Sequence, residues 1–415
     1  MGRKQCSVQL SKPELPEWPT SVVGAKYVRM LEKHVRKLRD GQHGNRQLFL
    51  DDLFIALLLG FFNATIRSLR TIEDFSQTRQ AQRFLSVTKL CRSTMSDFNR
   101  LVDPQLLEPL IARLLGEVRQ RCGAQDLPDL PARLQTILAV DGSFFRVAAD
   151  VAWAFCKRTD SGRPAKAGVR LDVHLDVATW LPTVVDVSGR DTSEAEHAAA
   201  HITPGAIHVY DRGIFSFDLV TKQQACGAFF VHRLREPGPR SPQFVAREER
   251  VLSAEDRAAG VVSDRVGRLA GSAHCAAPDS DLREIIITSP DEPDRTVRLL
   301  TNVLDQPAWV IALIYRYRWQ VELFFRWLKV STNFRHLISE SRTGILLSFY
   351  VALIGVLLQC AHTGTKLNKY AYNLLGMVAA GQAELDDILP IVAARNRQIE
   401  LDKASLARRR AKKHV

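Results

Sequence analysis

The sequence lacks several features that mark common protein classes. Its cysteines form no Cys-x-x-Cys pair, and their odd number and wide spacing indicate reduced thiols in a cytosolic protein. The N-terminus is polar, with no short apolar block before a cleavage site, so we predict no secretory signal. The chain also has no Gly-x-x-x-x-Gly-Lys phosphate loop and no internal repeat. The seven cysteines are Cys6, Cys91, Cys122, Cys156, Cys226, Cys275 and Cys360.

Long apolar runs are also missing. The two most apolar stretches, Leu53–Phe62 and Ile345–Leu358, are shorter than the roughly 20 residues that a membrane-spanning helix needs. We therefore predict that both are buried core helices and that the protein has no membrane partner.

Acidic residues are scarce relative to basic ones. Lys and Arg number 57 against 45 Asp and Glu, which gives a net charge of +12 and an isoelectric point near 9.5. Such an excess favours polyanions, because neutralised phosphates release condensed counterions. Nucleic acid and an anionic membrane surface both fit this charge. The basic tail Arg408–Lys413 is predicted to be disordered, and it either adds nonspecific DNA affinity or is simply solvated.

The length of 415 residues predicts two or three domains. Residues 1–130 form the predicted N-terminal region, and within it residues 46–120 show helical spacing of apolar residues with few Gly or Pro. A DNA-binding helix-turn-helix and a plain helical packing domain fit this segment equally well. Ala124–Pro131 is predicted to be a linker, and residues 341–415 a C-terminal helical region.

The middle of the chain alternates between strand-like and helix-like sequence. Leu171–Val177 alternates strictly and, with Leu181–Val187, predicts a hairpin. Residues 236–300 are rich in Pro, Gly, Asp and Arg and are predicted to be a β-rich insertion. The pattern predicts an α/β core. The other predicted strands are Thr136–Val140, Ala206–Tyr210, Phe229–Leu234, Phe244–Ala246, Val261–Val266 and Arg283–Thr288, and the predicted helices here are Ser193–His201 and Ile214–Cys226.

A strong helix is predicted over about Ala308–Val330, with an apolar face and a narrow polar face. Tyr315, Arg318, Glu322 and Lys329 share a stripe roughly 60° wide, and Arg326 borders it. Arg318 and Glu322 could be an ordinary surface pair at four-residue spacing. For the helix taken alone, this solvated surface is the favoured interpretation, and the alternative is a functional site that holds one carboxylate among cations.

Two aspartates elsewhere in the chain favour the functional interpretation of this stripe. Asp141 ends the apolar run in AVDGS, and Asp211 ends another in VYDRG. Each alone is more typical of a turn. Together they can meet Glu322 at one edge of a sheet, where three carboxylates suit Mg²⁺. Two such ions about 4 Å apart can hold both the attacking and the leaving oxygen of a phosphoryl displacement, and Mn²⁺ is expected to substitute.

The pattern Tyr-x2-Arg-x3-Glu-x6-Lys is complete at Tyr315, Arg318, Glu322 and Lys329. With AVDGS and YDRG, it resembles the DDE transposases of bacterial insertion sequences, in the insertion-sequence-four family. The resemblance implies an RNase H-like catalytic domain at 131–340, interrupted by the insertion at 236–300 and flanked by helical regions. It implies that Asp141, Asp211 and Glu322 bind two divalent metal ions. It also implies that Tyr315, Arg318 and Lys329, with the neighbouring Arg326, contact DNA.

The implied reaction is hydrolysis at the ends of a mobile element, followed by attack of the freed 3′-hydroxyl on target DNA. The implied partners are double-stranded DNA and a second copy of the chain on paired ends, in the bacterial cytoplasm at the nucleoid. Some relatives stack a tryptophan of the insertion on a flipped base, but no Trp lies between Trp180 and Trp309 here. A nuclease that never joins DNA and a catalytically dead DNA-binding derivative are the alternatives.

Two further clusters compete for attention. His197 and His201 are four residues apart, but the zinc-protease order His-Glu-x-x-His is absent, so a solvated helix face is predicted. Asp172, His174 and Asp176 share one face of a strand, for which a polar sheet face beside the site is predicted rather than a metal site.

Overall fold

A computed structural model describes the main elements of the chain, in two compact units: Met1–Met95 with Leu367–Val415, and Ser96–Lys366. The basic tail Arg408–Lys413 and, apart from Leu130, the predicted linker Ala124–Pro131 lie outside the described residues. The described residues are 24–35, 48, 50–63, 66, 68–122, 130, 134, 136–147, 153–158, 164–238, 241–271, 278–288, 295–331, 338–364 and scattered positions from 374 to 405.

The first unit is helical where it is described. It contains α1 (Ala25–Val35), α2 (Leu50–Phe62) and α3 (Leu69–Ser76), and α4 (Arg92–Leu101) begins in it. The helix α2 is buried from Leu50 to Gly60, as its apolar sequence predicts. A capping box between Ser68 and Thr71 starts α3 and satisfies backbone N–H groups that the first turn leaves unpaired.

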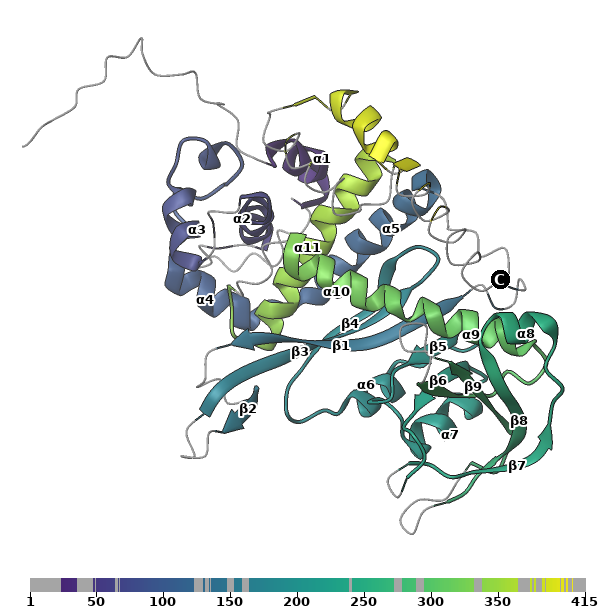
Figure 1. The fold of residues 1–415 in the computed structure, drawn as a ribbon. Coiled ribbons are helices and arrows are strands. Elements are labelled where there is room, and N and C mark those ends of the chain that lie inside the picture. The colour runs from purple at the N-terminus through teal and green to yellow at the C-terminus, as the bar shows by residue number, and fades with distance from the viewer. Residues whose placement is uncertain are drawn as a thin grey trace, which may run out of the picture. The chain divides into compact units, whose positions relative to one another are not determined.

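The second unit is built around a ten-stranded mixed sheet (Figure 1). Nine strands follow the order β2-β3-β1-β5-β6-β10-β9-β8-β7, and β4 pairs with β3. Their bounds are β1 Ile137–Val147, β2 Phe155–Arg158, β3 Pro164–Asp176, β4 Leu181–Ser188, β5 Ile207–Tyr210, β6 Phe229–Leu234, β7 Phe244–Glu249, β8 Val261–Leu269, β9 Leu282–Thr288 and β10 Thr296–Thr301.

Strand pairing explains how the centre of this sheet is built. β1 and β5 are parallel, as are β5 and β6, whereas β1 and β3 are antiparallel. The predicted hairpin is present as β3 and β4. One boundary differs from the sequence prediction: β1 continues past Val140 to Val147, because β3 pairs with it along that whole length. Asp141 therefore lies within a strand rather than at its end.

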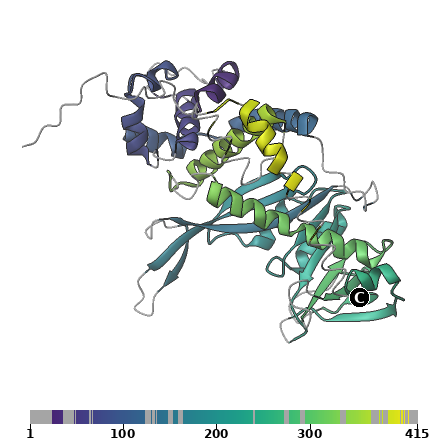
Figure 2. The same cartoon turned by 45° about the horizontal axis from the view of Figure 1, so that its top comes forward.

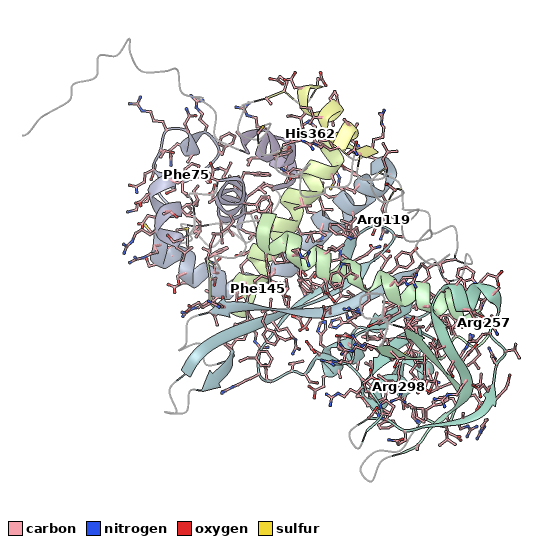
Figure 3. The ribbon with its side chains drawn as sticks, viewed as in Figure 1. Phe75, Arg119, Phe145, Arg257, Arg298 and His362 are labelled. Atoms are coloured by element: carbon pink, nitrogen blue, oxygen red, sulfur yellow. The ribbon has the colours of Figure 1, made fainter. Side chains whose placement is uncertain are left out.

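The strands of the segment 236–300 do not form a separate body. β7, β8 and β9 continue the sheet, and β10, which the sequence pattern missed, joins them to β6. Buried ion pairs hold this part together: Arg298, labelled in Figure 3, is 2.6 Å from Glu284, and Arg283 is 2.6 Å from Asp264. The alternation of β10 is hard to recognise in the sequence because Arg298 is one of its buried residues.

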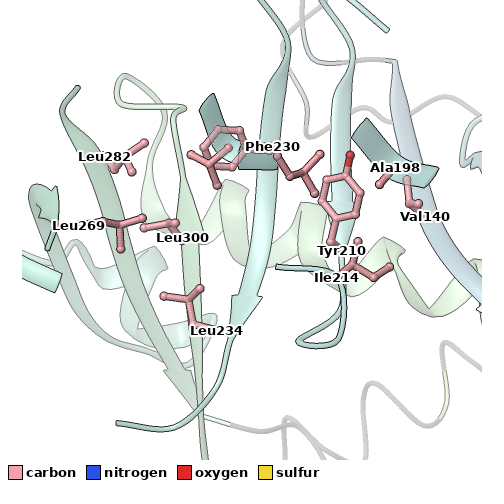
Figure 4. Close-up of a cluster of buried hydrophobic side chains, with 11 residues drawn as sticks. Val140, Ala198, Tyr210, Ile214, Phe230, Leu234, Leu269, Leu282 and Leu300 are labelled. Carbon is pink, nitrogen blue, oxygen red and sulfur yellow. The ribbon is translucent and has the colours of Figure 1, made fainter. Parts of the chain in front are cut away.

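Helices lie on both faces of the sheet (Figure 1). α6 (Glu194–Ala200) and α7 (Phe217–Ala225) cover one face, where a hydrophobic cluster joins them to β1, β5 and β6 (Figure 4). α9 (Ala308–Tyr317) and α10 (Trp319–Ser331) run along the other face, and the short α8 (Ala254–Ala258) packs on α9 and β8. The cluster comprises Val140, Ala198, Tyr210, Ile214, Leu219, Val220, Phe230, Leu234, Leu269, Leu282 and Leu300.

Two longer helices complete this unit. α5 (Glu108–Cys122) packs against α11 (Arg342–Thr363), and α11 also packs on β4 (Figure 2). The compact unit is therefore larger than the predicted segment 131–340. Among the described helices, α11 alone is long and apolar enough to cross a membrane, and 89% of that stretch, Arg342–His362, is buried inside the protein. Its burial, rather than its length, makes it a core helix.

Four histidines of this unit lie together, His201 half-buried and the other three buried. His174 on β3, His197 and His201 at the end of α6, and His208 on β5 have ring centroids 4.5–5.9 Å apart. The prediction that His197 lies on a solvated helix face is wrong: it is 3% exposed, because α6 turns this side chain onto the sheet. The predicted polar face of β3 is also buried, since Asp172, His174 and Asp176 are each at most 8% exposed.

Acid is expected to destabilise this core. Burial lowers the pKa of His174, of His208 to about 4 and of His232 to about 3, from 6.5. The unfolded chain then binds protons that the folded chain does not. The contribution of these histidines to the free energy of unfolding should therefore be largest above about pH 6.5 and fall as the pH drops towards 4, by about 1.4 kcal/mol per pH unit for each histidine.

Urea unfolding between pH 8 and pH 4.5 tests this prediction. His174→Leu removes one buried titrating ring and is expected to make the pH dependence shallower. Equal slopes for the two proteins would show that His174 takes up no proton on unfolding. Measurements at pH 8, where histidines are neutral in both states, provide the reference for the packing cost of the substitution.

Candidate active site

The register of the sheet brings two of the predicted acids into neighbouring positions. Val140 of β1 is paired with Tyr210 of β5. Asp141 directly follows Val140 and Asp211 directly follows Tyr210, so the two aspartates occupy neighbouring positions. Asp141 accepts a hydrogen bond of 2.9 Å from the backbone N–H of Gly142. Both aspartates are half-buried and lie where the parallel pairing of the two strands stops.

The third predicted acid, Glu322, comes from the helices α9 and α10, which lie on the face of the sheet opposite to α6 and α7. The predicted helix 308–330 is divided at Arg318, where a tight turn joins α9 to α10: the N–H of Arg318 donates to Tyr315 (3.0 Å) and that of Val321 to Arg318 (3.1 Å). Tyr315, near the end of α9, and Glu322, in the first turn of α10, both lie next to Arg318. Contacts of α10 with β1 and β3 place this turn over the strands.

Arg318 lies at the centre of the group. Its Nη2 is 2.6 Å from Oε1 of Glu322, and its guanidinium carbon is 5.7 Å from the ring centroid of Tyr315. Burial opposes its charge, but the charges of Tyr315, Asp211 and Glu322 raise the pKa of Arg318 overall. The guanidinium is therefore a permanent cation that compensates the acids around it.

Asp141 titrates in an unusual range. Burial raises its pKa to about 7, the Gly142 N–H and Arg318 oppose that shift, and the charges of Glu194 and Glu322 add to it. Asp141 therefore lies within electrostatic reach of Arg318, Glu322 and Glu194. Carboxylates with a pKa perturbed in this way are typical of functional sites, because a bound cation or a transferred proton relieves the repulsion between their charges.

The predicted DNA-contacting residues lie at different distances from the acids. Lys329 donates a 2.7 Å hydrogen bond to Ser143 and lies 4.9 Å from the ring centroid of Phe145, which is labelled in Figure 3. It therefore lies against β1 two residues beyond Asp141. Arg326 is exposed, and its recorded contact is with the Trp319 ring, 6.0 Å away.

Two charged residues of the site were not found from the sequence. Arg233 on β6 is 3.4 Å from Oδ1 of Asp211. Glu194, the first residue of α6, is electrostatically coupled to Asp141 and to Asp211. Arg233 could have been suspected from its position two strands from Asp141, but Glu194 has the sequence of any helix-starting glutamate.

The donor chemistry of the acids fits a hard divalent cation, since carboxylate oxygens are the ligands that Mg²⁺ and Mn²⁺ prefer. In the described part of the chain, no three His, Cys, Asp or Glu side chains are arranged to hold a metal ion. Arg318 instead pairs with Glu322, and Arg233 with Asp211.

Comparison with known proteins gives a consistent family. Residues 132–358, more than half of the chain, match the model of the transposase DDE domain. The chain is 28% identical over 209 residues to "Putative transposase y4zB" of Sinorhizobium fredii, which covers 50% of this chain and 56% of that protein. It is 25% identical over 205 residues to "Probable transposase for insertion sequence element IS5377" of Geobacillus stearothermophilus, and this match covers 48% of this chain and 51% of that protein.

The chain thus spans about half the length of the curated relatives that it matches. The matched family segment begins just before β1 and ends within α11, so it contains Asp141, Asp211 and the whole of α9 and α10. By this match, over a segment that includes every element of the site, the chain belongs to the transposase DDE domain family.

Proposed function

We propose that this protein is a cut-and-paste DNA transposase. It would hydrolyse DNA at the ends of a mobile element and then transfer the freed 3′-hydroxyl into target DNA. The observation that carries the proposal is that Arg318, which pairs with Glu322, interacts electrostatically with both Asp141 and Asp211, inside a segment that matches the transposase DDE domain. The core formed by β4, β3, β1, β5 and β6 supports an RNase H-like fold.

In this proposal, Asp141, Asp211 and Glu322 hold two Mg²⁺ ions, which when bound would polarise the scissile phosphate and lower the pKa of the attacking water. Arg318, freed from Glu322, would hold a phosphate oxygen bidentately, as planar guanidinium groups do. Tyr315 would orient Arg318 through its ring. Its hydroxyl would donate a hydrogen bond, since burial raises the pKa of Tyr315 and keeps this group protonated. Lys329 would add a point charge beside β1, and Arg326 one on the exposed face of α10.

Several finer assignments belong to the same proposal. The complete Tyr–Arg–Glu–Lys pattern supports membership of the insertion-sequence-four family. Residues 131–340 would be the catalytic domain, 1–130 would bind the element's ends, and 341–415 would support a homodimer on paired ends. The net charge of +12 supports a DNA partner in the bacterial cytoplasm and nucleoid.

A cleavage and joining assay tests the proposal. The substrate is labelled DNA carrying the sequences that flank the gene, incubated with the full chain and Mg²⁺, Mn²⁺ or EDTA. We expect metal-dependent cuts at paired inverted repeats, each leaving a 3′-hydroxyl, and joining of these ends to a second, unlabelled plasmid.

The same assay separates the alternatives. Cutting without joining would identify an RNase H-like nuclease. Binding of the ends without cutting in either metal would identify a DNA-binding derivative with a dead site. No binding and no cutting would contradict the proposal and leave the basic charge to another polyanion.

A further inference from the structure

Glu194 occupies an unexpected position between the two aspartate motifs. Its Oε1 lies 2.9 Å from where a Cβ on Gly142 would stand, and its Oε2 lies 3.4 Å from the corresponding point on Gly213. Gly142 directly follows Asp141, and Gly213 lies two residues beyond Asp211. The carboxylate therefore lies beside both motifs, in the space that a side chain at either glycine would enter, although it comes from α6 on the other face of the sheet.

The strand pairing explains how Glu194 reaches this place. β5 pairs with β1 only as far as Tyr210 and Val140, whereas β1 continues to Val147. Beyond Val140, no strand among the described residues pairs with β1 on the β5 side, so the sheet is open there in the described part of the chain. Glu194 lies at this opening, and groups from the two faces of the sheet can approach one another through it.

Local structure does not account for the position of this carboxylate. The capping box at the start of α6 is made by Ser193 and Glu196, not by Glu194. Arg170, the nearest cation, already binds Asp172 at 2.7 Å and lies 3.9 Å from Glu194. No side chain or backbone group among the described residues donates a hydrogen bond to Glu194.

The surroundings of Glu194 are also short of positive charge. Two further carboxylates, those of Asp172 and Asp211, lie within electrostatic reach of Glu194. A carboxylate beside other carboxylates is costly unless a cation shares the site. Glu194 therefore adds a further carboxylate to those of the two aspartate motifs.

We propose that Glu194 is a fourth carboxylate ligand of the divalent-metal site, together with Asp141, Asp211 and Glu322. The inference rests on the proposed function, because that function requires the metal site. Four carboxylates carry the charge that neutralises two divalent cations, whereas three leave an excess positive charge. Arg318 and Arg233 would then be free to hold DNA phosphates rather than protein acids.

Direct binding of Mn²⁺ to the full chain tests the inference without relying on catalysis. Free Mn²⁺ is followed by electron paramagnetic resonance during titration of the wild type, Glu194→Gln and Glu196→Gln. Glu194→Gln is expected to weaken Mn²⁺ binding by at least the roughly tenfold that loss of a supporting residue costs. Glu196→Gln is the matched control: it lies on the same helix, is exposed, and glutamine also completes a capping box.

The outcomes are distinguishable. Mn²⁺ binding by Glu194→Gln equal to that of the wild type would overturn the role of Glu194 while leaving the proposed function intact. Absence of Mn²⁺ binding by the wild type, together with absence of metal-dependent cleavage, would overturn both. If Glu194→Gln does not fold, Glu194→Asp keeps the charge near Arg170 but shortens its reach, and unchanged Mn²⁺ affinity in that variant would overturn the inference.

Discussion

Replacing Glu322 by glutamine is expected to lower the rate of metal-dependent DNA cleavage by at least about a thousandfold, or about 4 kcal/mol of transition-state stabilisation. The substitution keeps the size and shape of the side chain and removes the charge. It removes the proposed anionic metal ligand and also the partner that Arg318 holds at 2.6 Å. Arg318 would then face Asp211 and Asp141 alone, which further disfavours a cation at the site.

The chain offers a close control for this variant. Arg113 and Glu117 on α5 form a pair with the same four-residue spacing and a distance of 3.2 Å, but both side chains are exposed. Glu117→Gln should change stability by less than about 1 kcal/mol and leave cleavage unchanged. Cleavage by a folded Glu322→Gln protein at the wild-type rate would contradict the assignment of Glu322 as a metal ligand.

Sequence patterns predicted the elements around the site well where side chains alternate clearly. Phe229–Leu234 was predicted with its observed bounds, and the hairpin of β3 and β4 was found from strict alternation in LDVHLDV. The alternation of buried and exposed side chains along a strand is a local property, so it can be recognised without knowing which strands pair with it. The predicted helix Ser193–His201 is also present, as α6 with Ser193 and His201 as its cap residues, and capping is likewise a local property.

Features that depend on a distant partner were missed or misplaced. The end of β1 depends on β3, which extends pairing seven residues beyond Val140 to Val147. β10 was missed because Arg298 is buried against Glu284, and a charged residue in a strand normally suggests the exposed face. The burial of His197 likewise depends on β3, whose His174 lies beneath it.

The residues of the site divide in the same way, into those that local sequence patterns group together and those whose position depends on distant strands. Tyr315, Arg318 and Glu322 could be grouped from helical spacing, and Asp141 and Asp211 from their strand contexts. Arg318 is the residue through which the structure connects these acids. Glu194 could not have been grouped with them, since its approach depends on the opening beside β1 that only the strand pairing reveals.

Replacing Arg283 by methionine is expected to reduce the free energy of unfolding by about 3–5 kcal/mol, because it leaves the Asp264 carboxylate buried without its partner. Both side chains are at most 4% exposed, and the guanidinium binds Asp264 through Nε at 2.7 Å and Nη2 at 2.6 Å. Arg283 also donates to the backbone carbonyls of Val303 and Gln306, just before α9 begins. The ion pair therefore anchors the helix that carries Tyr315.

Urea unfolding of three variants tests this expectation and identifies its cause. Arg247→Met removes an exposed pair with Asp281 and should cost less than about 1 kcal/mol. Combining Arg283→Met with Asp264→Leu removes both buried charges, so it should recover much of the stability lost in the single variant. If the double variant stays as unstable as Arg283→Met, the contacts of Arg283 with the carbonyls before α9, rather than its ion pair, stabilise this part of the sheet. A single variant within 1 kcal/mol of the wild type would show that neither set of contacts matters.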